Sequence, residues 1–118
     1  MFEILIGLGA IGLFCLVGWA VGAAPDSLIR GGAGLVALGF AYGIPTAVVY
    51  HWRLYRSLVC ADRLPPRWWL SPTSHHDALP SEDRRGVLVW GALGGSGFVV
   101  ILLGIGLISI GLWRILAA

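Results

Sequence analysis

Three long apolar stretches constrain the fold of this chain more than any other feature. They cover residues 4–24, 32–50 and 87–113, and none contains a charged side chain or a histidine. A helix needs about 20 apolar residues to cross a bilayer core, and each stretch is close to this length or longer. The period-2 alternation of a barrel strand is absent. Since only helices and closed barrels satisfy their backbone polar groups in lipid, the sequence predicts an all-α integral membrane protein with three transmembrane helices.

The composition supports this interpretation. Of the 118 residues, 58% are hydrophobic and only 12% are charged, whereas a soluble domain carries about a quarter charged residues. This deficit excludes a disordered chain, a nucleic-acid-binding tail and an ordinary cytosolic domain. The net charge of +2 is too small to indicate a nucleic-acid partner. We therefore expect a single membrane domain over residues 1–118, with the lipid bilayer as its surroundings.

The first apolar stretch resembles a signal peptide, because its end, Gly22-Ala23-Ala24, is rich in small residues. The first three residues carry no basic side chain, however, and Pro25 would directly follow the cut. The apolar run is also longer than the 7–15 residues of a signal sequence. We therefore expect a retained helix over about residues 4–24.

A short turn is predicted between the first two helices, over residues 25–31. Asp26 or Ser27 is expected to cap the second helix or to close this turn, because both side chains can accept hydrogen bonds from nearby backbone amides. The second helix should then span residues 32–50.

The main polar segment, residues 51–86, divides into two parts. Leu54, Leu58 and Ala61 recur on one helical face, so the second helix is expected to extend to about residue 64. Four prolines between residues 65 and 80 forbid a regular helix there. This part is predicted to be an irregular interfacial segment rich in Pro, Trp and Arg.

The third helix is predicted over about residues 82–113. Ser81, Glu82 and Asp83 precede its apolar part, and acidic side chains favour the positive N-terminal end of a helix.

Arginine distribution predicts the orientation. All eight basic residues are arginines; six lie in residues 51–86, and the other two, Arg30 and Arg114, belong to the opposite side. Cytoplasmic loops are enriched in positive charge. We therefore expect the N-terminus and residues 51–86 to be cytoplasmic and the C-terminus outside, in a bacterial inner (cytoplasmic) membrane.

Glycine is the strongest signal inside the apolar stretches. Small residues four apart let two helices approach closely and gain dispersion contacts that lipid does not supply. Two interpretations stay open: the glycines pack the three helices on one another, or some of them face another subunit. The candidate packing residues are Gly18, Gly22, Gly39, Gly43, Gly91, Gly94 and Gly95.

Tryptophan and arginine mark a second candidate region, formed by Trp52, Arg67, Trp68 and Trp69. Amphipathic tryptophan rings favour the headgroup level of a bilayer, which makes a membrane anchor the first interpretation. A docking surface is the alternative, because Trp and Arg also dominate interface hot spots.

The sequence His75-His76-Asp77 is a weak candidate metal site. Zinc or copper needs three or four ligands in a fixed geometry, and adjacent histidines in an irregular segment point in different directions. His51 and Cys60 could join them, although no spacing requires it. We predict no cofactor, and we expect Cys15 and Cys60 to be free thiols because Cys15 lies within an apolar stretch.

The absence of ionisable side chains from all three stretches disfavours an ion pump or a proton-coupled transporter. Pro45 is the one expected kink, with the Thr46 hydroxyl available to the freed backbone. No nucleophile motif, phosphate-binding loop or metalloprotease motif is present, so we predict that the chain is not an enzyme.

The favoured function is therefore a small non-catalytic accessory, assembly or scaffolding subunit of a larger integral membrane complex. Its Gly-rich helix faces would pack against other subunits, and a hetero-complex is favoured over a homo-oligomer. The first alternative is a self-assembling small transporter or channel, in which Tyr42 and Trp90 would face a pore. The second is a metal-handling membrane protein that uses His75, His76 and Asp77.

Overall fold

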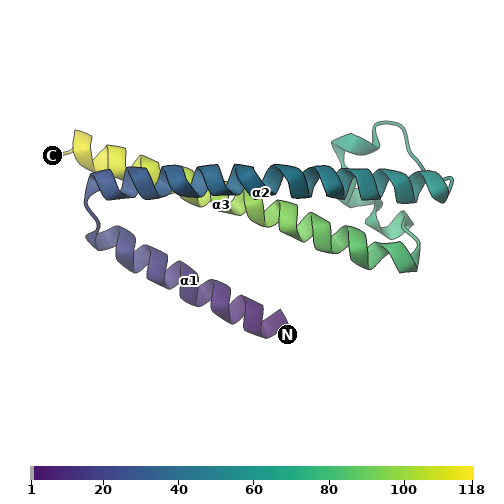
Figure 1. Ribbon diagram of the computed structural model, residues 1–118, viewed down its shortest axis with the longest axis horizontal. Helices are drawn as coiled ribbons and strands as arrows, with labels where there is room; N and C mark the ends of the chain where they lie inside the picture. Colours follow the sequence, from purple (N-terminus) through teal and green to yellow (C-terminus); the bar gives the residue numbers. More distant parts are fainter. Residues whose placement is uncertain (1) are drawn as a thin grey trace.

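The computed structural model describes residues 2–118, side chains being described at position 7 and from position 9 onward; Met1 lies outside the described residues. Residues 2–118 form three α-helices and two short 3₁₀-helices, without strands. The helices α2 and α3 form a long antiparallel pair, and the two 3₁₀-helices lie at one end of it (Figure 1). The elements are α1 (Phe2–Gly22), α2 (Pro25–Cys60), η1 (Trp68–Leu70), η2 (Pro72–Ala78) and α3 (Ser81–Leu116).

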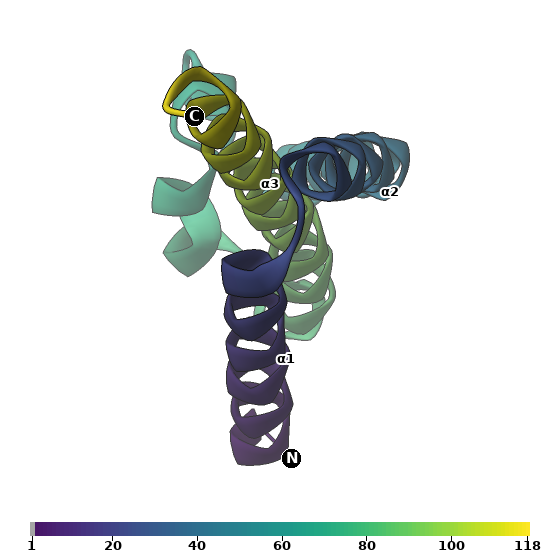
Figure 2. The ribbon, with the colours of Figure 1, turned by 90° about the vertical axis from the view of Figure 1, so that its left-hand side faces the viewer.

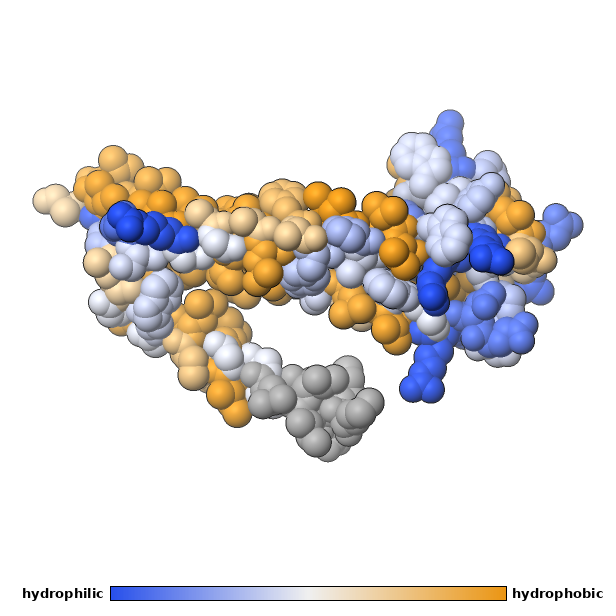
Figure 3. Space-filling view, in the orientation of Figure 1, coloured by the Kyte–Doolittle hydropathy of each residue, from blue (hydrophilic) through white to orange (hydrophobic). Residues whose placement is uncertain are grey.

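Two of these helices are long and apolar enough to cross a membrane. Both α2 and α3 contain 36 residues, or about 54 Å at 1.5 Å per residue, against a hydrocarbon core of about 30 Å. The apolar part of α1 within the described residues is shorter, Gly9–Gly22. On the face shown in Figure 3, the middle of the helix pair is mainly apolar. Most hydrophilic residues on this face lie at the end that carries η1 and η2.

The prediction of a turn over residues 25–31 is wrong. The connection between α1 and α2 consists of Ala23 and Ala24, and α2 begins directly at Pro25. Proline is well suited to the first helical position, because its missing N–H would have no helical partner there and its φ angle already matches a helix.

Neither predicted cap forms. The N-cap of α2 is Ala24, which is extended and makes no side-chain cap bond. Asp26 instead lies in the first turn of α2, where its carboxylate pairs with Arg30 at 2.9 Å. This i,i+4 pair is exposed and places the acid near the positive end of the helix dipole.

The second helix continues past its apolar part, but it ends at Cys60 instead of at about residue 64 as predicted, because the backbone turns at Asp62. Asp62 has a φ of 52°, in the left-handed region that Asp tolerates better than most residues. The Arg63 amide then donates to the Leu58 carbonyl at 3.0 Å, which closes the helix end.

The proline-containing residues 65–80 form no α-helix, and α3 begins directly after Pro80. Glu82 and Asp83 lie in the first turn of α3, where their charges favour the positive end of the helix dipole.

Pro45 lies inside α2 without ending the helix. Proline leaves the carbonyl four residues earlier, that of Ala41, without its amide partner. The Thr46 hydroxyl does not replace this bond, because it donates to the carbonyls of Tyr42 at 2.8 Å and Gly43 at 3.0 Å.

The backbones of α2 and α3 touch at glycines. A Cβ atom added at Gly97 would lie 2.6 Å from the Cα of Gly43, and one added at Gly104 would lie 2.6 Å from the carbonyl oxygen of Gly32. Real Cβ atoms do not come this close to a backbone atom. The contact therefore depends on the absence of a side chain at these positions.

The helix α1 diverges from the pair, so that its N-terminal end lies apart from α2 and α3 (Figures 1 and 2). Its C-terminal end is held by Arg114 of α3, whose guanidinium donates to the carbonyls of Ala23 at 3.0 Å and Val21 at 3.2 Å. Between α1 and α3 lies an apolar cleft of about 290 Å³, lined by residues such as Val17 and Ile110.

Candidate functional site

A small hydrophobic core joins α2, α3 and the connection between them at one end of the molecule; this connection, residues 61–80, is called the polar segment from here on. Leu54 and Leu58 are fully buried, and they lie one turn apart on the same face of α2. Tyr50, Leu79 and Val87 complete the buried cluster. Because these five residues come from three segments, the polar segment has a fixed place on the helix pair.

Two polar contacts tie η2 to the helices. The Tyr50 hydroxyl is hydrogen-bonded to Nε2 of His76 at 2.7 Å, and the Arg84 guanidinium donates to Asp77 at 2.6 Å. Tyr50 is buried and Asp77 is exposed, so the first contact is sheltered from water and the second is screened by it.

A third polar contact joins α2 directly to α3. The Ser57 hydroxyl donates to a carboxylate oxygen of Asp83 at 2.5 Å, and Ser57 is 5% exposed. A hydroxyl donating to a carboxylate is a charge-assisted bond, stronger than one between neutral groups. Neither Tyr50 nor Ser57 was among the residues predicted from the sequence.

The two predicted interfacial tryptophans of the polar segment have different environments. Trp68 is half-buried and packs against the core, with its ring 5.5 Å from that of Tyr55 and 6.2 Å from that of His51. Trp69 is 60% exposed, and its neighbour Arg67 is also exposed. Trp68 therefore holds the segment in place, while the Trp69 and Arg67 side chains lie on the surface of the chain.

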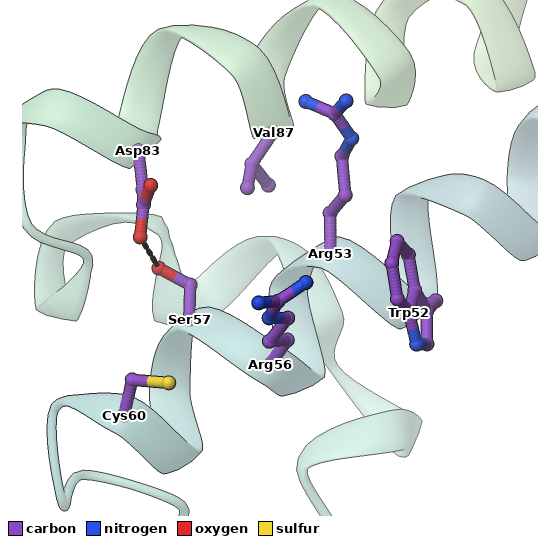
Figure 4. Close-up of a pocket in the computed structure, with 7 residues that line it drawn as sticks. All are labelled: Trp52, Arg53, Arg56, Ser57, Cys60, Asp83 and Val87. Atoms are coloured by element: carbon purple, nitrogen blue, oxygen red, sulfur yellow. Dashed lines mark hydrogen bonds between the residues drawn. The ribbon is translucent and has the colours of Figure 1, made fainter.

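The fourth predicted interfacial residue, Trp52, borders a polar cavity between the end of α2 and the start of α3 (Figure 4). The Arg56 guanidinium lies over the Trp52 ring and the Arg53 guanidinium over the Trp90 ring, each 5.7 Å from the ring centre. We call the cavity between the end of α2 and the start of α3 the arginine cavity. It measures about 460 Å³ and is lined by Trp52, Arg53, Arg56, Ser57, Cys60, Asp83 and Val87.

The predicted metal residues are not gathered around one point. His76 is bonded to Tyr50 and Asp77 to Arg84, on different elements, whereas His75 makes neither contact. In the part of the chain whose side chains are described, no group of three or more His, Cys, Asp or Glu residues could hold a metal ion.

The two residues that could have completed a metal site lie elsewhere. Nδ1 of His51 is hydrogen-bonded to the carbonyl of Ala47 at 2.9 Å, and Cys60 borders the arginine cavity. Cys15 and Cys60 are free, as expected, and both are exposed.

The predicted packing glycines divide into two groups. Gly39, Gly43, Gly91 and Gly94 lie close to the partner helix, whereas a Cβ atom added at Gly18, Gly22 or Gly95 would meet nothing within 4 Å. Four further glycines at the α2–α3 contact were not predicted: Gly32, Gly97, Gly104 and Gly111.

A seven-residue spacing could have identified these four glycines. Gly97, Gly104 and Gly111 recur at this interval in α3, and Gly32 and Gly39 do so in α2. This is the period of two helices that keep one seam in contact along their length.

His76→Ala is expected to loosen the polar segment. The substitution removes the bond to Tyr50, worth about 1 kcal/mol, and should raise proteolytic cleavage within residues 65–80 about fivefold. His75→Ala is the matched control, since His75 makes no such bond, and should leave cleavage unchanged. Limited proteolysis of the detergent-purified protein measures both rates. Equal rates in the two variants would show that this bond does not hold the segment.

The chain matches no protein-family model, no curated protein and no solved structure. Its function must therefore be inferred from its own residues.

Proposed function

We propose that this chain is a membrane protein whose three helices all cross the bilayer. The apolar windows of α2 and α3 are only 17% buried within the chain, whereas the core helix of a soluble protein hides most of its apolar surface. Phe98 and Val48, for example, are each 62% exposed. Such surface is stable in lipid and unfavourable in water.

Charge supports the same orientation that the sequence predicts. The helix ends near residues 51–86 carry six arginines, and the opposite end carries Arg30 and Arg114. Positive charge accumulates on the cytoplasmic side. We therefore place the end with η1 and η2 in the cytoplasm, together with the N-terminus, and the C-terminus outside, in a bacterial cytoplasmic membrane.

Within that membrane, we propose a non-catalytic accessory or assembly role in a larger complex. One observation carries this proposal: most glycines of α2 and α3 lie against another side chain or the partner helix, whereas no described glycine of α1 does. Gly9, Gly12, Gly18 and Gly22 meet nothing within 4 Å. Because small residues allow close helix approach, this helix is suited to pack against a helix of another subunit.

A channel made by one copy of the chain is disfavoured. The α2 and α3 backbones are in contact at Gly43 and Gly97, which leaves no room for a water-filled path between them. A pore would therefore have to form between several copies. Tyr42 and Ser96, whose hydroxyls lie 3.3 Å apart on the outside of the pair, would be polar groups for its wall.

Native mass spectrometry after mild detergent extraction from the native host tests the accessory role. We expect other membrane subunits to co-purify in a fixed ratio with the wild-type chain. The Gly18→Leu and Gly22→Leu double variant should lose them, because two bulky side chains would block close approach to α1. Gly34→Leu is the control, since Gly34 is also open but lies on α2.

Two results would contradict the proposal. A pure homo-oligomer would overturn the accessory role and favour the channel, which flux measurements could then test. Retention of the same partners by the α1 double variant would show that α1 is not the contact surface.

A further inference from the structure

The arginine cavity contains two cations, Arg53 and Arg56, that have no anionic partner among the described side chains. Among the described side chains, no carboxylate lies within 4.0 Å of the guanidinium of Arg53 or Arg56. Neither guanidinium donates a hydrogen bond to another described residue; both lie over tryptophan rings. Each guanidinium has five N–H donors in a planar fork that matches a phosphate or carboxylate.

The third charged group at this cavity is already engaged. Asp83 accepts a hydrogen bond from Ser57 and forms no ion pair with either arginine. The lining residues therefore carry two positive charges and one negative charge, a balance of +1. This balance suits a ligand with a single negative charge.

An apolar groove adjoins the arginine cavity, and Trp52 lines both. This groove measures about 590 Å³ and follows α2 away from the polar end through Ile44 and Val48. Its full lining is Ile44, Ala47, Val48, His51, Trp52, Tyr55 and Trp68. A cationic compartment and an apolar one therefore share the Trp52 side chain.

The expected depth of these two spaces in the proposed bilayer fits the binding of a lipid. Residues 32–50 are free of charge, and His51, Trp52 and Arg53 follow them. Tryptophan and arginine at the end of an apolar span lie at headgroup level. The cationic compartment is thus level with lipid phosphates, and the apolar groove is level with acyl chains.

We propose that this surface binds one anionic glycerophospholipid. Arg53 and Arg56 hold its phosphodiester through charge-assisted hydrogen bonds, and an acyl chain follows the groove past Trp52 and Val48. A choline headgroup is disfavoured because its own cation would approach the two guanidinium groups. The inference rests on the membrane location proposed above and is independent of the accessory role.

Native mass spectrometry of the delipidated, detergent-purified chain tests this proposal. Phosphatidylglycerol and phosphatidylcholine are added in parallel, and the retained lipid is counted for each. The test variant is Arg53→Gln with Arg56→Gln. The control is Arg63→Gln with Arg85→Gln. It also removes two positive charges from this end of the molecule, but neither residue lines the cavity.

The wild type and the control are expected to retain one phosphatidylglycerol and to bind phosphatidylcholine more weakly. The test variant should bind phosphatidylglycerol at least about tenfold more weakly, the effect of losing one charge-assisted hydrogen bond. Trp52→Ala should weaken retention as well, because it opens the boundary between the two spaces. Circular dichroism confirms that each variant keeps its helices.

Three results would overturn the proposal. Equal binding by the test variant and the control would assign any retention to general surface charge. Glycerol phosphate binding as tightly as the lipid would assign the cavity to a free phosphate. Equal retention of phosphatidylcholine would exclude selection by charge. If the chain failed to enter phosphatidylcholine nanodiscs at all, the membrane location itself would fail, so the two failures are distinguishable.

Discussion

Replacing Gly97 by alanine is expected to destabilise the α2–α3 pair by about 1–3 kcal/mol, the usual cost of overpacking a close contact. The added Cβ would lie 2.6 Å from the Cα of Gly43, which is backbone and cannot rotate away. The helices must therefore move apart, and that movement weakens neighbouring contacts such as Gly32 against Gly104. Gly97→Leu should separate the helices outright. Titration of mixed micelles with a denaturing detergent, followed by tryptophan fluorescence, measures the stability.

Gly95→Ala is the matched control for this prediction. Gly95 lies in the same helix two residues away, and an added Cβ there would meet nothing within 4 Å. Its stability should equal that of the wild type, as should that of Leu102→Ala, because Leu102 is exposed. If Gly97→Ala and Gly95→Ala had the same stability, the backbone contact would not hold the pair together.

Leu58→Ala is expected to destabilise the polar end by about 2–5 kcal/mol, the range for buried leucines. Leu58 is fully buried, together with Leu54, against Leu79 of the polar segment. Truncation leaves a cavity at the point where three segments meet, so residues 65–80 should detach from the helix pair. The rate of proteolysis within residues 65–80 measures the local detachment. The detergent titration followed by tryptophan fluorescence measures the loss of overall stability.

Leu70→Ala is the control here, because Leu70 is 61% exposed and buries little surface. We expect its proteolysis and stability to match those of the wild type. If Leu58→Ala unfolded no more easily than Leu70→Ala, the buried cluster would not be what anchors the polar segment.

The helical elements were predictable because their signals are local. Charge-free stretches of this length have few alternatives to a helix, and the prolines of residues 65–80 exclude an α-helix by removing amide donors. The start of α2 was mispredicted although its signal is also local. Pro25 was interpreted as part of a turn. Proline is also common at the first position of a helix, and it occupies that position here.

The candidate site was harder to predict because its contacts are distant in sequence. Tyr50 and His76 are 26 positions apart, and so are Ser57 and Asp83. Nothing in the local sequence indicates which polar side chains the irregular segment brings together. The arginine cavity likewise depends on where α3 begins relative to the end of α2.

The bond between Arg114 and the end of α1 has a consequence for the order of folding. The last carbonyls of a helix lack amide partners, and in lipid each such group is costly. Arg114 supplies donors to Val21 from 93 positions further along the chain. During translation the first helix is therefore made early, but it gains its C-terminal partner only after the end of α3 has been synthesised and α3 has packed against α2. The N-terminal helix is expected to be the last to reach its final position.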